Sequence, residues 1–143
     1  MVPPAGPVGL LCSVHPRWVA EILGGRKTVE IRRRPPSLGR PLPMLLYATR
    51  PFGAVVGHCV AEGVIRASAD ELRRIVGNRS AVPANELKLY LQDAAAPGAI
   101  EISHPRVTAY PVLLRFRPPQ SWMWLRGDDL LHFELLRNVT SEP

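Results

Sequence analysis

The chain has 143 residues, of which 46% are hydrophobic, and its formal net charge is +6 with a pI of about 10.1. This is enough apolar material for one core and too short a chain for two, so we expect a single domain at residues 8–137 between a leader at 1–7 and a tail at 138–143. No apolar run approaches the roughly 18 to 20 residues of a membrane span, and the N-terminus has no basic region ahead of a hydrophobic stretch, so we expect a cytoplasmic protein without a membrane partner.

The positive charge is concentrated in the first third of the chain. Residues 1–50 contain eight of the 18 basic residues and only two of the 12 acids. A localised basic surface suits a polyanion such as nucleic acid, because each neutralised phosphate releases counterions. The alternative for the charge alone is that a high pI only aids solubility.

The cysteines and histidines argue against a metal site. Cys12 and Cys59 fall in apolar, strand-like stretches and form no Cys-x-x-Cys pair, so we expect two buried, reduced thiols. The four histidines are scattered without metal-ligand spacing. We therefore expect no metal and no cofactor.

The first half of the chain predicts one helix among several strands. We expect a strand at 8–14, a helix that begins at His15-Pro16 and stops at Gly24-Gly25, a strand at 28–32 and another at 42–49. The helix carries Trp18 on its apolar stripe, which predicts a core position for this ring. A proline-rich loop at 35–41 separates the last two strands.

The second half predicts two helices and further strands. A long strand at 54–65 contains Gly57 and Gly63, which indicate bulges or bends. Ser68 with Glu71 forms a capping-box pattern for one helix, and Pro83 begins the next, which runs to Asp93. Further elements are expected as strands at 99–103 and 107–116, a turn of helix behind Pro118-Pro119 at 122–125, and an amphipathic element at 128–136.

The segment from Gly24 to Arg34 concentrates the polar chemistry. Val29 and Ile31 alternate with Thr28, Glu30 and Arg32, so one face of the strand is apolar and the other offers a polar row. Arg32, Arg33 and Arg34 end the strand, and consecutive strand residues cannot all point the same way.

Gly25-Arg26-Lys27-Thr28-Val29-Glu30-Ile31-Arg32, behind a helix that ends in glycine, resembles the signature of the ASCH domain family in the PUA-like superfamily. Tyr47-Ala48-Thr49 leading into Ala54-Val55-Val56-Gly57, and Pro118-Pro119-Gln120-Ser121, support the resemblance over residues 10–125. It implies an α+β fold, a small mixed PUA-like β-barrel with peripheral helices, and a cleft for RNA or a nucleoside. Some members of this family deacylate N4-acetylcytidine with a lysine, a threonine and a glutamate, and at least one resembles a ribonuclease.

Lys27 matches the catalytic lysine of the deacylating group, but Glu30 stands where that group has its catalytic threonine. A desolvated lysine can act as a base or activate a hydroxyl. We expect Glu30 instead to hold Lys27 protonated, which favours binding over proton abstraction. Thr28 offers a hydroxyl, although strand alternation points it away from Lys27 unless the turn alters the geometry. The family's catalytic glutamate has three candidates here, which are Glu62, Glu71 and Glu86.

The main hypothesis is an ASCH module that binds RNA or a modified nucleoside in a basic cleft. The alternatives are a hydrolase of the ASCH type, either an amidohydrolase on N4-acylcytidine or a ribonuclease, and an interaction module whose arginines bind an acidic protein. If the protein is an enzyme, the catalytic candidates are Lys27, Thr28 and Glu30. The candidates for nucleic-acid binding are Lys27, Arg32, Arg33, Arg34, Tyr47, Thr49, Arg50, Gln120, Ser121 and Trp122.

Overall fold

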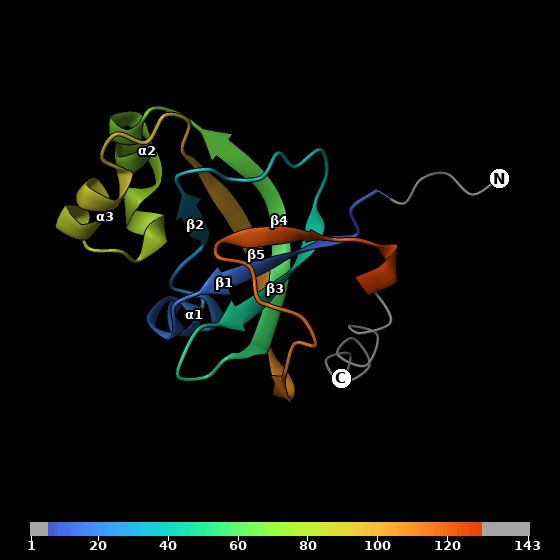
Figure 1. Ribbon diagram of the computed structural model, residues 1–143. Coiled ribbons are helices and arrows are strands. Elements are labelled where there is room, and N and C mark those ends of the chain that lie inside the picture. Colours follow the sequence, from blue (N-terminus) through green and yellow to red (C-terminus); the bar gives the residue numbers. More distant parts are fainter. Residues whose placement is uncertain (1–5, 130–143) are drawn as a thin grey trace.

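Six strands form one mixed, curled sheet in the computed structural model, which describes residues 6–129 (Figure 1). The strand order is β2-β5-β4-β3-β1-β6, with β1 and β3 parallel and every other neighbouring pair antiparallel. The strands are β1 (Gly9–Val14), β2 (Val29–Arg32), β3 (Leu42–Ala48), β4 (Ala54–Arg66), β5 (Gly98–Val112) and β6 (Trp122–Leu125). The helices are α1 (Pro16–Leu23), α2 (Ala69–Val76) and α3 (Ala84–Leu91), with short 3-10 turns η1 (Gly77–Ser80) and η2 (Gly127–Asp129).

The sheet makes an open half-barrel. Within residues 6–129, β2 and β6 are its two edges and do not pair with each other. The three helices gather at the end of the sheet where β2 lies (Figure 1). The predicted α+β class with a PUA-like sheet and peripheral helices is confirmed, while the domain boundaries at 8 and 137 stay a prediction. The amphipathic element expected at 128–136 and the tail at 138–143 lie almost wholly outside the described residues.

The predicted helix signals are confirmed. Pro16 opens α1, the His15 side chain accepts a hydrogen bond from the backbone N–H of Arg17, and Gly25 leaves the helix at a φ of +79°. Ser68 caps α2 by accepting from the backbone N–H of Glu71 at 3.2 Å. Both helix starts therefore satisfy a backbone N–H that has no partner inside the helix.

The bulges or bends predicted for β4 at Gly57 and Gly63 correspond to shifts in its strand register. Its pairing with β5 shifts register between Val55 and Gly57 and between Ala61 and Gly63. A Cβ atom added to Gly57 would lie 2.8 Å from the Leu23 side chain and 2.9 Å from the Arg106 carbonyl oxygen. Gly57 is therefore needed because α1 packs directly against the backbone of β4.

Two predictions about the end of the chain are wrong, one on the division of a strand and one on a turn of helix. The strands expected at 99–103 and 107–116 form one long strand, β5, which continues past a left-handed residue at His104 (φ 52°). Residues 122–125 form β6 and not a turn of helix, because they pair with β1 from Cys12 opposite Trp122 to Gly9 opposite Leu125. Tertiary pairing decides the outcome for such a short apolar stretch.

The core lies on both faces of the sheet. One cluster joins α1 to the inner face through residues such as Leu10, Ile22 and Leu46, and it contains the two cysteines. A second cluster places Val29 and Ile31 of β2 under α2 and α3. Both cysteines are buried free thiols, as predicted, and burial raises the pKa of Cys12 from 9.0 to about 11.

Candidate functional site

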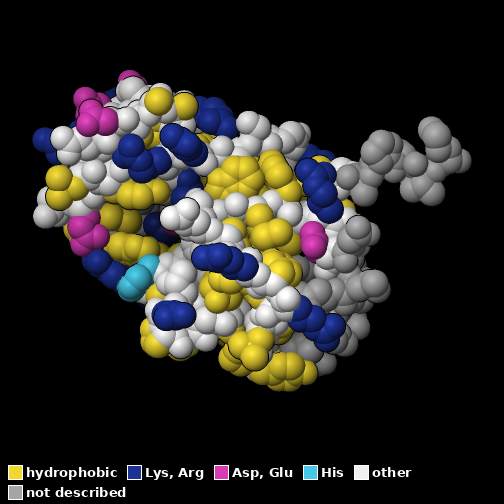
Figure 2. Space-filling model, viewed as in Figure 1, with side chains coloured by type: hydrophobic (Ala, Val, Ile, Leu, Met, Phe, Trp, Pro, Cys, Tyr) yellow, Lys and Arg dark blue, Asp and Glu magenta, His cyan; other side chains and the backbone are white. Residues whose placement is uncertain are grey.

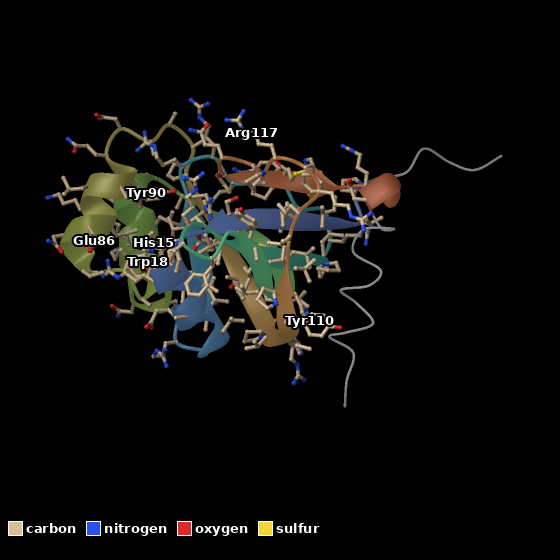
Figure 3. All side chains as sticks on the ribbon, turned by 60° about the horizontal axis from the view of Figure 1, so that its bottom comes forward. His15, Trp18, Glu86, Tyr90, Tyr110 and Arg117 are labelled. Carbon is tan, nitrogen blue, oxygen red and sulfur yellow. The ribbon has the colours of Figure 1, made fainter. Side chains whose placement is uncertain are left out.

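A pocket of about 240 Å³ opens between α1, α3 and the inner face of the sheet. Figure 2 shows this region hollowed between the helices and the sheet, with basic side chains in and around it. Figure 3 shows His15 and Trp18 of the α1 region beside Glu86 and Tyr90 of α3. The lining residues are Ser13, Val14, His15, Trp18, Lys27, Glu30, Ile31, Arg32, Val82, Glu86, Leu87 and Tyr90.

Three buried charged side chains line the pocket together. Glu30 bridges two cations, with its Oε1 3.2 Å from the Nζ of Lys27 and its Oε2 accepting from the Nε and NH2 of Arg32 at 3.0 and 2.8 Å. Lys27 is 2% exposed, Glu30 6% and Arg32 9%. The polar row that Glu30 and Arg32 form on β2 is therefore buried.

The five N–H groups of Arg32 are all occupied. Besides its bonds to Glu30, NH2 donates to the Ser13 carbonyl at 2.9 Å. NH1 donates to the Ser121 hydroxyl at 2.9 Å and lies 3.4 Å from its carbonyl oxygen. The guanidinium thus has no donor left for a ligand. It holds Glu30 in place and ties β2 to β1 and to the residue before β6, across the open edge of the half-barrel.

Lys27 retains capacity to interact with a ligand. Its Nζ donates to the Ser80 carbonyl at 2.6 Å and pairs with Glu30. A protonated amine has one further N–H, and a neutral amine has a lone pair instead. Either one is available to a molecule in the pocket.

Burial and Glu30 act on the pKa of Lys27 in opposite directions. Burial away from water, the larger effect, lowers the pKa, while the charge and hydrogen bond of Glu30 raise it. The net result is a pKa below the ordinary value of 10.5. Glu30 thus favours the protonated form of Lys27, as expected, but desolvation outweighs it in the net pKa.

Thr28 lies outside the pocket. Its hydroxyl accepts from the Nε of Arg79 at 3.1 Å, and Arg79 also pairs with Glu101 of β5 at 3.1 Å. Strand alternation begins only at Val29. The preceding turn directs the Lys27 side chain towards Glu30 and the Thr28 side chain away from Lys27 and Glu30. Ser13 supplies a hydroxyl among the pocket residues, and this hydroxyl donates to the Pro119 carbonyl at 2.6 Å.

A wide groove of about 1030 Å³ adjoins the pocket and shares Tyr90 with it. It brings together five of the predicted nucleic-acid-binding residues, namely Arg33, Arg34, Gln120, Ser121 and Trp122. Arg33 donates to the carbonyls of Tyr90 and Gln92 at 2.7 and 2.8 Å, which caps the end of α3. Arg32, Arg33 and Arg34 thus have three different surroundings, as consecutive residues leaving a strand must.

The other three predicted binding residues lie away from both hollows. Tyr47 packs with the cluster of Leu11, Leu45 and Val55. The backbone N–H of Thr49 donates to Val14, and Arg50 lies in the exposed turn that follows. Neither the pocket nor the groove is lined by any of them.

Among the three candidate glutamates, the structure places Glu86 at the pocket. Its two carboxylate oxygens lie 3.1 and 3.3 Å from the NH1 of Arg17. Glu62 instead accepts from Ser103, and Glu71 pairs with Arg74 on the surface of α2.

Trp18 is the main site residue that the sequence assigned elsewhere. Its ring packs partly on the core and partly lines the pocket. The Arg17 guanidinium lies 4.1 Å from the ring centroid and the Lys27 Nζ 5.3 Å from it. The sequence signal for this role was the two cations near Trp18, namely Arg17 beside it and Lys27 in the turn after the helix. Ser13, His15 and Tyr90 had none, because only the fold brings them to the pocket.

Within residues 6–129, no group of three or more His, Cys, Asp or Glu side chains is placed to hold a metal ion. None of the helices in that range is long and apolar enough to cross a membrane.

Comparisons with known proteins agree with the resemblance seen in the sequence. No family model matches the chain. An ASCH domain-containing ribonuclease of Zymomonas mobilis is 27% identical over 124 residues, which are 82% of this chain and 84% of that protein. The crystal structure of ASCH from Zymomonas mobilis superposes with a TM-score of 0.83 at 25% identity, over 94% of this chain and 97% of the other. The N-terminal domain of Staphylothermus marinus McrB, at 11% identity and a TM-score of 0.55 over 90% and 94% of the two chains, shares the fold alone.

The sequence match and the superposition each extend over more than four fifths of both chains. The chain is therefore similar in sequence and in fold to ASCH domain proteins over most of its length.

Proposed function

We propose that this protein binds single-stranded RNA, with one unpaired base in the pocket and the adjoining backbone in the groove. The observation that carries the proposal is the pairing of a buried Lys27 amine with the Trp18 ring in one pocket that opens on an arginine-lined groove. Aromatic platforms beside a basic track are the usual means of holding single strands.

The pocket has the size and chemistry for one base. Its volume of about 240 Å³ is below the roughly 300 to 1,000 Å³ typical of drug-sized ligands. Trp18 offers a stacking face, and Lys27 offers a donor or a lone pair. Glu30 uses three of its four or so acceptor positions on Lys27 and Arg32, so it retains one for an amino group on a base edge.

Charge in the groove suits the phosphate backbone. Arg33 and Arg34 face one acid there, Asp93. The relative from Zymomonas mobilis is named a ribonuclease, and RNA is the partner that this name supports for our chain. The high charge of the N-terminal third then has a physical role besides solubility.

Titration of a fluorescent eight-nucleotide single-stranded RNA, followed by anisotropy, tests the proposal. We expect binding at about 50 mM salt that weakens as salt rises, and about a 5- to 150-fold loss in Trp18→Ala from lost stacking. Lys27→Met should also bind weakly. Lys88→Met removes the chain's other lysine, which lies outside pocket and groove, and should leave affinity unchanged. Absence of binding at low salt, or equal losses in both lysine variants, contradicts the proposal.

RNA cleavage is the second candidate function, favoured by the lowered pKa of Lys27 and by the ribonuclease relative. In this reaction the neutral amine removes the proton of a ribose 2′-hydroxyl. The 2′-oxygen then bonds to the adjacent phosphorus, the bond to the 5′-oxygen breaks, and that oxygen takes up a proton from the Lys27 ammonium or from water, leaving a cyclic phosphate and a 5′-hydroxyl. Hydrolysis of N4-acylcytidine has less support, because the Thr28 hydroxyl lies away from Lys27.

End-labelled RNA separates binding from cleavage. A cleaving enzyme yields shortened products from RNA and none from the same sequence with 2′-O-methyl groups, and Lys27→Met abolishes the products. Incubation with N4-acetylcytidine in parallel tests the amidohydrolase alternative. Cleavage that persists in Lys27→Met refutes the assignment of this lysine.

A further inference from the structure

Trp122 holds its ring in a fixed position in the groove. Its Nε1 donates to the backbone oxygen of Arg34 at 2.9 Å. The Trp124 ring lies 5.3 Å from it, centroid to centroid, at an interplanar angle of 78°. The ring is therefore oriented in advance from two sides, and an oriented aromatic surface loses little entropy when a ligand stacks on it.

The groove around Trp122 is next to the pocket and not a separate hollow. Tyr90 lines both. Ser121, the residue before Trp122, accepts from the NH1 of Arg32, and Arg32 lines the pocket. The hydrogen bond between Ser121 and Arg32 thus links the start of β6 to the base pocket.

Arg34 supplies a cation at the same place. Its backbone oxygen orients Trp122, and its guanidinium makes no hydrogen bond or ion pair with any residue of the described part of the chain. Arg33, by contrast, directs NH1 to the end of α3. Arg34 is thus the arginine of this segment whose donors remain available to a phosphate.

We propose that the groove is a second base subsite, in which a neighbouring base stacks on Trp122 while Arg34 binds the phosphate that joins it to the base in the pocket. The inference rests on the proposed function and names its ligand more closely. The smallest ligand that fills the site is a dinucleotide and not a free nucleoside. Because the indole N–H is already bonded to Arg34, the second subsite selects for a stackable base and not for base identity.

The length of the ligand tests this inference on the unaltered protein. Calorimetric or competition titrations compare a nucleoside, a dinucleotide and a trinucleotide, all 2′-O-methylated against cleavage, with the eight-nucleotide RNA as reference. We expect the dinucleotide to bind at least 10-fold tighter than the nucleoside, and the trinucleotide to gain less than that over the dinucleotide.

Matched variants assign the gain to residues. Trp122→Leu should lose about 5- to 150-fold for the dinucleotide and little for the nucleoside. Tyr110→Leu removes an exposed aromatic ring of β5 that lines neither the pocket nor the groove, and should lose much less. Arg34→Ala should weaken dinucleotide binding and reduce its salt dependence. Arg40→Ala, an exposed arginine of the same loop, should change neither.

The outcomes separate this inference from the function on which it rests. If the nucleoside and the dinucleotide bind equally well, or if Tyr110→Leu loses as much as Trp122→Leu in variants that remain folded, the second subsite is refuted while RNA binding stands. If the eight-nucleotide RNA does not bind either, the proposed function itself fails.

Discussion

Glu30→Gln should destabilise the protein strongly, because Glu30 is the only acid in contact with two buried cations among the described residues. Lys27 can release its proton, and its pKa should fall further once the charge and hydrogen bond of Glu30 are gone. Arg32 cannot, since a guanidinium stays protonated in proteins. The change therefore leaves a charge that is 9% exposed without its counter-ion.

The magnitude follows from the bonds that Arg32 loses. Two charge-assisted hydrogen bonds, at 3.0 and 2.8 Å, become contacts with a neutral amide. At about 1.5 to 3 kcal/mol for each bond to a charged group, and about 3 to 5 kcal/mol for breaking a buried pair, we expect a loss near 3 to 5 kcal/mol. That is a large part of the roughly 5 to 15 kcal/mol that holds a domain folded.

Urea unfolding at pH 7 measures this loss, with the slope of the transition used to check that the unfolded state is unchanged. Glu101→Gln is the matched control, because Glu101 lies opposite Val29 in the neighbouring strand and also pairs with an arginine, Arg79. This pair is exposed, with 38% of the Glu101 side chain and 42% of the Arg79 side chain accessible to solvent. It should lose no more than about 1 kcal/mol. A loss in Glu30→Gln within about 1 kcal/mol of the control would refute the account of the buried charges.

Three further predictions follow from the packing and the buried groups. The pKa of Lys27 is lowered in the folded state, so between that pKa and 10.5 the unfolded chain binds more protons. In urea titrations over this range, the stability of the wild type relative to Lys27→Met should therefore rise with pH. A fall would contradict the assigned direction of the pKa shift. Burial raises the pKa of Cys12 to about 11 and also raises that of Cys59, so a thiol reagent at pH 8 should label neither in the native protein and both after unfolding in guanidinium. Ser68→Ala removes the side-chain cap of α2 and should lower the free energy of unfolding by about 1 kcal/mol, while Ser37→Ala, in an exposed loop, should change it less.

The parts of the fold that local chemistry dictates were predictable from the sequence. Helix starts at Pro16 and Ser68, the stop at Gly25 and the irregularities at Gly57 and Gly63 each depend on one or two neighbouring residues. The strand at 122–125 was not predictable, because four residues show no reliable period and pairing with β1 decides their conformation.

The site was predictable to the extent that a single segment builds it. Lys27, Glu30 and Arg32 were identified together, but their burial was not foreseen, since η1, α3 and the residues before β6 cover them from distant parts of the chain. Alternation correctly separated Thr28 from Lys27 but wrongly put Thr28 on the face of Glu30 and Arg32, because the turn and not the strand sets its direction. Trp18 has the spacing of a core residue and is one in part, so periodicity alone could not show that its ring also lines a pocket.

A crystal structure with a 2′-O-methylated trinucleotide tests the central claim most directly. We predict one base in the pocket against Trp18, within hydrogen-bond distance of the Lys27 Nζ or of Glu30, and a neighbouring base on Trp122. An oligonucleotide that binds in solution but lies elsewhere in the crystal, with the pocket at Lys27 empty, would contradict the account.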